Sequence, residues 1–167
     1  MRNVGEAPFP NELRKVLLLD LLVWQRAVEL AWQRTDVASF DARDQRVHLV
    51  NLVIATRNVL RISEVARDIP GVRAALDAFN RRVPRVKDVR DVLEHFDEYR
   101  RGKGRLQRAS PFELSIDVVH RGTDVGLRLG GGLEIVANDL FEAVLELAVA
   151  VCDELRPGQP IAHRPRP

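Results

Sequence analysis

Apolar residues recur at the spacing of an α-helix along most of this chain, and this pattern restricts it to a mainly helical fold. Only between residues 112 and 136 does the spacing change to the alternation that is typical of β-strands. The 167 residues are 46% hydrophobic, which is enough for one domain with a sizeable core. The sequence therefore predicts a four- to five-helix up-and-down bundle, with a small antiparallel β-hairpin or sheet inserted before the C-terminal helix.

The first two helices carry the longest helical patterns in the chain. They span about 11–34 and about 41–68, and Asp41 is the expected N-cap of the second. Each helix is expected to bury one apolar face. The core positions expected on these two helices are Leu13, Val16, Leu17, Leu21, Trp24, Val28, Leu30, Ala31, Trp32, Val47, Val50, Leu52, Ile54, Val59, Ile62 and Val65.

Prolines and glycines delimit two further helices. A short third helix is expected after Pro70. A fourth spans about 86–101 and ends before Gly102 and Gly104, because glycine readily adopts the left-handed conformation found at helix C-termini.

The β-hairpin is expected to cover about 112–136. A first strand, a polar turn, a returning strand and a short third strand are expected at 112–118, 120–124, 125–129 and 133–136. Asn138 is then the expected cap of a final helix that runs to about residue 155. A hairpin of this size is marginal in water, so it must pack on the helical bundle or on a partner chain.

Domain limits and compartment follow from the ends of these patterns. Residues 1–155 are expected to form a single domain, and residues 156–167, rich in proline and basic residues, a flexible tail. The single cysteine, Cys152, has no partner for a disulfide and is expected to be a small core residue. The N-terminal residues have no signal-peptide pattern, and no apolar run approaches the roughly 20 residues needed to span a bilayer. We therefore expect a cytoplasmic protein without membrane association.

Positive charge is concentrated in one segment. Residues 81–108 contain ten Lys or Arg and five acidic residues, a charge of +5, which leaves −3 for the rest of the chain. Within it, the residues expected to bind RNA are Arg100, Arg101, Lys103, Arg105 and Arg108, a run without an acidic residue. Because 23 of the 26 basic residues are arginine, an ordinary solvated surface is an equally good interpretation.

The candidate chemistry lies in the fourth expected helix, where Arg90 and His95 form an R-x4-H pattern followed by Phe-Asp-Glu-Tyr. In this pattern the sequence resembles the HEPN superfamily of helical ribonucleases. The resemblance covers about 41–155 and implies a helical bundle whose motif helix comes late and is followed by one further helix. Arg43 and His48 show the same spacing, so His48 is an alternative to His95.

The resemblance implies a metal-independent endoribonuclease. His95 would act as the general base that takes the proton of a ribose 2′-hydroxyl, and Arg90 would balance the charge that grows on the phosphate. The residues expected to support this pair are Asp91, Glu94, Asp97 and Tyr99. Asp91, four residues before His95, would hold one ring nitrogen, and Tyr99 would stack on a base or bind phosphate. In HEPN toxins that are paired with a nucleotidyltransferase, a tyrosine two residues after the motif histidine is modified. That position is Asp97 here, so this control mechanism is not carried over.

The spacing of the two catalytic candidates also implies a dimer. Five residues along a helix separate Arg90 and His95 by about 140°, so they flank a groove. Two such helices across a twofold axis would bring two arginines and two histidines into one composite site. A homodimer is therefore expected, with RNA as substrate and an antitoxin or other neutralising protein as a further partner. The chain shows no spacing typical of metal ligands or cofactor-binding loops, so no cofactor is expected.

A protein of another class fits the same residues. Arg90, Glu94, Asp97 and Arg101 could form a solvated ladder of ion pairs on a non-catalytic helical dimerisation or protein-interaction domain. An open, positively lined site around His95 would favour the enzyme, and burial of His95 against apolar neighbours would favour the interaction domain.

Overall fold

The apolar periodicity of the sequence translates into a mainly helical fold with a small antiparallel sheet before the last helix, as predicted. The structure is a computed structural model and describes residues 10–35, 41–95, 98, 115–130 and 132–156. The elements in chain order are α1 (Asn11–Thr35), α2 (Ala42–Val65), α3 (Pro70–Arg82), α4 (Val86–Glu94), β1 (Ile116–Arg121), β2 (Asp124–Leu129), β3 (Leu133–Val136) and α6 (Ala137–Leu155).

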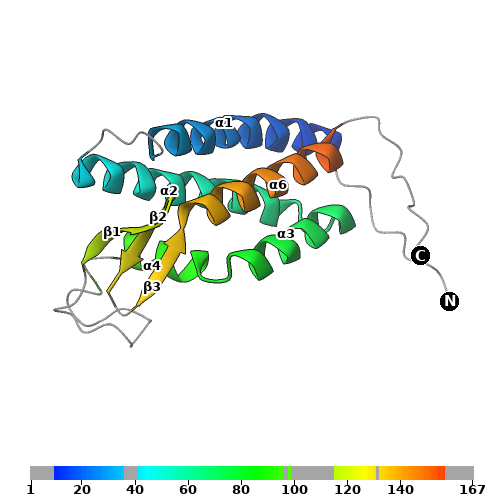
Figure 1. The fold of residues 1–167 in the computed structure, drawn as a ribbon. Coiled ribbons are helices and arrows are strands. Elements are labelled where there is room, and N and C mark those ends of the chain that lie inside the picture. Colours follow the sequence, from blue (N-terminus) through cyan, green and yellow to red (C-terminus); the bar gives the residue numbers. More distant parts are fainter. Residues whose placement is uncertain (1–9, 36–40, 96–97, 99–114, 131, 157–167) are drawn as a thin grey trace.

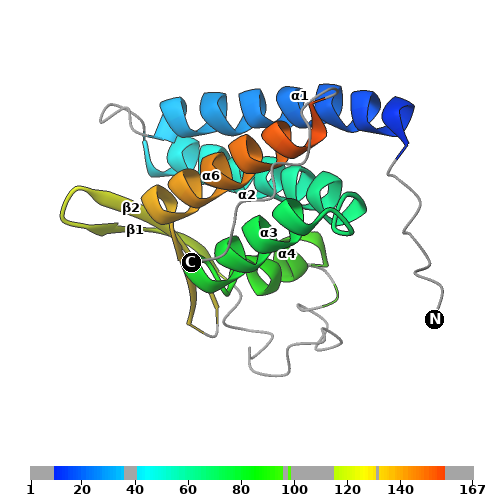
Figure 2. The ribbon, with the colours of Figure 1, turned by 90° about the vertical axis from the view of Figure 1, so that its right-hand side faces the viewer.

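The C-terminal helix α6 lies at the centre of the fold. It packs between α1 on one side and α3 on the other, with α2 beside it (Figure 1). Its buried residues include Leu140, Leu147 and Val151, and Phe141 stacks on Trp32 of α1 with ring centroids 4.9 Å apart. Figure 2 shows the consequence, with α1 forming one outer layer and α3 and α4 lying on the opposite side of α6 and α2.

Helices α1 and α2 form a hairpin that buries only part of its apolar surface. Leu17, Leu21 and Val28 of α1 are buried, as predicted. Six other predicted core positions are wrong, because they face outward, where no described element covers them. These exposed residues are Leu13, Val16, Leu30, Val47, Ile54 and Val65. Both helices carry aliphatic residues on more than one face, so spacing alone overestimates the core.

The sheet has the strand order β1-β2-β3, and both pairings are antiparallel. It packs on the bundle through contacts with α2, α4 and α6, and Leu127, Leu129 and Ile135 are buried there. The predicted turn at 120–124 is too long, because pairing of β1 and β2 continues to Arg121 and Asp124. Only Gly122 and Thr123 remain for the turn, and Gly122 has the positive φ of +63° that such a tight connection requires.

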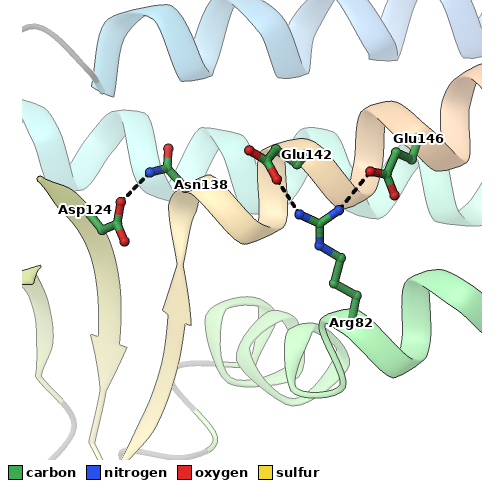
Figure 3. A network of polar contacts seen from close by, with 5 residues as sticks. All are labelled: Arg82, Asp124, Asn138, Glu142 and Glu146. Carbon is green, nitrogen blue, oxygen red and sulfur yellow. Dashed lines mark hydrogen bonds and ion pairs between the residues drawn. The ribbon is translucent and has the colours of Figure 1, made fainter.

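Helix α6 follows β3 without an intervening loop. Its N-cap is Val136, which makes no side-chain capping bond, so the predicted capping role of Asn138 is wrong. Asn138 lies inside the helix and donates a hydrogen bond to the carboxylate of Asp124 on β2 (Figure 3). Asp41, in contrast, caps α2 as predicted by accepting a hydrogen bond from the backbone N–H of Arg43.

Figure 3 also shows how α3 is tied to α6. The guanidinium of Arg82 donates to the carboxylates of Glu142 and Glu146, which lie one turn apart on α6. Both hydrogen bonds and the two negative charges raise the pKa of Arg82 above its ordinary value, because they favour its charged form.

Candidate functional site

Of the two predicted catalytic residues, Arg90 lies in the middle of α4 and His95 directly follows the helix. This helix ends at Glu94, so the prediction of a continuous helix to residue 101 is wrong. His95 is the C-cap, with φ −111° and ψ 29°, and its backbone N–H donates to the carbonyl of Asp91 at 3.0 Å. The buried residues of α4 are confined to its first two turns, and a helix this short depends on such packing.

His95 faces solvent. Its side chain is 45% exposed, and its Nδ1 atom lies 3.7 Å from Oε1 of Glu98. The predicted supporting residues Asp97 and Tyr99 lie outside the described residues, as do Gly102, Gly104 and the predicted RNA-binding residues Arg100, Arg101, Lys103, Arg105 and Arg108. The described part of the site therefore consists of α4, His95, Glu98 and the helix that packs beside α4.

Helix α2 supplies basic residues that sequence reasoning missed. Glu94 forms an ion pair with Arg57 of α2, and its other carboxylate oxygen lies 3.8 Å from Nε of Arg90. One carboxylate is therefore shared between two guanidinium groups. The side chains of Arg57 and Arg90 are both about two-thirds or more covered, and among the described residues their Nε atoms have no hydrogen-bond partner.

A groove of about 450 Å³ lies between α2 and α4 beside this cluster. Its lining residues are Leu60, Arg61, Glu64, Val65, Lys87 and Arg90. Three cations thus face one carboxylate. Among the described residues that line this groove, the one ion pair joins Lys87 Nζ to Glu64 Oε1 at 4.0 Å.

The cations of this cluster affect the pKa of Arg57. Partial burial, together with the positive charges of Arg61 and Arg90, lowers the pKa of the Arg57 guanidinium from its ordinary value. The only hint of this cluster in the sequence is the spacing of Arg57, Arg61 and Glu64, which places them on one face of α2.

The alternative histidine lies elsewhere. His48 is half-buried near the start of α2, nine residues before Arg57, a distance of about 13 Å along the helix. Arg43 and Asp44, the residues that share its pattern, are exposed. The structure thus places Arg90 in the lining of the basic groove and His95 directly after the end of α4, and it leaves His48 apart from the groove.

Neither a thiol nor a metal cluster marks another site in the described residues. Cys152 is buried as predicted, and this burial raises the pKa of its thiol. Within the ranges that the structure describes, no three His, Cys, Asp or Glu side chains are grouped so that they could hold a metal ion.

Comparisons with known proteins leave the chain unassigned. No protein-family model, curated protein or solved structure matches it significantly. The described helices include none that is long and apolar enough to cross a membrane. The function is therefore inferred from the side chains around the groove.

Proposed function

We propose that this chain is a HEPN-like, metal-independent endoribonuclease that acts in the cytoplasm as a toxin or a component of a defence system. The observation that carries the proposal is the position of Arg90, which lines a basic groove one turn before the exposed His95. The excess of cations there suits a phosphodiester backbone. The proposed reaction is the one implied by the resemblance of the R-x4-H pattern to the HEPN superfamily.

The reaction needs a base and a charge stabiliser. His95 takes the proton of a ribose 2′-hydroxyl, and the 2′-oxygen then attacks the adjacent phosphorus. The bond from phosphorus to the 5′-oxygen breaks, which leaves a 2′,3′-cyclic phosphate and, after protonation, a 5′-hydroxyl. Arg90 balances the negative charge that grows on the non-bridging oxygens.

A homodimer completes this proposal. Facing α4 segments would form one composite site, and the second His95 would supply the proton to the leaving 5′-oxygen. An endoribonuclease of this kind also requires a neutralising protein in the cell that makes it, so an antitoxin is a further proposed partner.

Cleavage of a mixed RNA pool in EDTA tests the enzyme. The wild type should cut, and His95→Ala and Arg90→Ala should lower the rate at least about a hundredfold, the usual contribution of such groups, while light scattering finds the oligomeric state unchanged. His48→Ala is the matched control and should retain activity. Loss of cutting in His48→Ala alone would show that the assigned site is wrong.

A non-catalytic dimerisation domain is the second candidate, and the outer face of α1 favours it. Val16, Leu19 and Val23 are 54%, 65% and 64% exposed on neighbouring turns of this helix. Exposed aliphatic rows of this kind often mark protein interfaces. A folded dimer that cuts no RNA, and that Val23→Glu converts to a monomer, would support this candidate over the enzyme.

A further inference from the structure

The groove between α2 and α4 contains a charge pattern that the two helices do not complete by themselves. At one end Arg57 pairs with Glu94, and at the other Glu64 pairs with Lys87. These two pairs show that the helices run antiparallel past each other. Arg61 lies four residues after Arg57 on α2, and Arg90 lies four residues before Glu94 on α4. The same register therefore brings Arg61 opposite Arg90.

The middle of the groove therefore contains two positive charges, Arg61 and Arg90, with one ion pair on either side of them. Arg61 and Arg90 both line the groove, and the positive charges of both act on the guanidinium of Arg57. The described part of the chain offers Arg61 no ion-pair partner within 4.0 Å, and Glu94 is already shared with Arg57. Counted together, the four cations and two carboxylates leave a charge of +2 in a partly covered space.

We propose that this groove binds a phosphate group of RNA between Arg61 and Arg90, an assignment that rests on the proposed ribonuclease function. Two guanidinium groups can each donate paired hydrogen bonds to a tetrahedral oxyanion, which makes a phosphate a better fit than a single carboxylate. The groove is open to solvent, and its volume of about 450 Å³ is large enough for a nucleotide. Leu60 and Val65 provide an apolar wall for a ribose or a base.

Binding of an uncleavable RNA separates this proposal from the reaction itself. The probe is a short fluorescent single-stranded RNA with 2′-O-methyl groups, measured by anisotropy in EDTA. Arg61→Gln should weaken binding about tenfold, and the slope of log affinity against log salt should fall by about one. The matched control is Arg46→Gln, an exposed arginine on the same helix about 22 Å away, which should bind nearly as the wild type does.

Two unfolding measurements show that the variant is intact and identify the ligand. In phosphate-free buffer, Arg61→Gln should be as stable as the wild type or more stable, because it removes a repulsion. Inorganic phosphate should raise the melting temperature of the wild type and not that of Arg61→Gln.

Unchanged RNA affinity in Arg61→Gln, or an equal loss in Arg46→Gln, would overturn the proposal. Phosphate stabilisation through Arg61 without any RNA binding would overturn RNA as the source of the phosphate. Binding of the modified RNA that depends on Arg61, with no cutting of unmodified RNA, would support the groove assignment while removing the ribonuclease function.

Discussion

At the scale of single residues, two buried hydroxyl groups on α2 differ in whether they form a hydrogen bond. Ser63 donates to the carbonyl of Val59 at 2.8 Å. Thr56 is as deeply buried, yet its Oγ1 atom meets no hydrogen-bond partner in the described part of the chain. A buried hydroxyl without a partner is destabilising, because folding removes its hydrogen bond to water.

We therefore expect Thr56→Val to raise the free energy of unfolding by about 1 kcal/mol, since it removes the unpaired hydroxyl and keeps the branched shape. Ser63→Ala on the same helix should lower it by about 1 kcal/mol, because a satisfied hydrogen bond is lost. Urea denaturation monitored by circular dichroism measures both. A loss of stability in Thr56→Val would mean that this hydroxyl has a partner after all.

Single residues also mark the limit of sequence reasoning about the site. Arg90 and His95 could be chosen because their chemistry shows in local spacing. Arg57 and Arg61 could not, because they lie some thirty residues earlier and meet α4 only after the chain folds. The predicted capping role of Asn138 was wrong for a related reason, because the position of the N-cap depends on where β3 ends and α6 begins.

At the scale of elements, the central strand β2 depends on a residue without a side chain. Gly126 pairs with Val119 on one side and Val136 on the other. A Cβ atom at Gly126 would lie 2.7 Å from the carbonyl oxygen of Ile135, and this contact is with backbone, so it cannot be relieved by a side-chain rotation.

Gly126→Ala should therefore separate β2 from β3 and lower the free energy of unfolding by about 2 kcal/mol. The matched control is Gly122→Ala in the turn, where a Cβ meets nothing within 4 Å but the positive φ is retained, at a cost of about 1 kcal/mol. Amide hydrogen exchange should show faster opening of β3 only in the first variant. Equal protection of β3 in both would contradict this account.

Elements were predictable where one period dominates. Helix α1 and strand β3 have nearly the predicted bounds, because regular apolar spacing extends through each of them. The end of α4 could not be predicted, because the chain leaves the helical conformation at His95, and a histidine does not by itself indicate a helix end. The length of the turn between β1 and β2 was overestimated, because polar residues can pair in an exposed strand as well as form a loop.

At the scale of the whole molecule, the layers constrain how a dimer could form. Helices α1 and α4 lie on opposite sides of α2 and α6 (Figure 2), and the groove is lined by residues of α2 and α4. An interface on α1 would therefore hold the two grooves apart, and a composite site needs a different interface near α4. The fold class was predictable from spacing, but the covered face of α1 was not, because aliphatic residues line more than one side of it.

Subunit mixing tests the composite site. Wild-type chains refolded with an equal amount of His95→Ala chains should give about a quarter of the cleavage of the same total amount of wild-type chains, because only about a quarter of the dimers would carry both histidines of the shared site. Wild-type chains refolded alone are the control. Retention of half of the cleavage in a mixture that demonstrably exchanges subunits would show that each site is built within one chain.

The central position of α6 has a consequence for how the protein is made. Helices α1 to α3 and the sheet all contact this helix, yet its residues are among the last of the described fold to leave the ribosome. Until α6 docks, the apolar surfaces that it covers on α1, α2, α3 and the sheet stay open. A cell that synthesises this protein therefore has, during translation, an interval in which a chaperone can reach the nascent chain before its core closes.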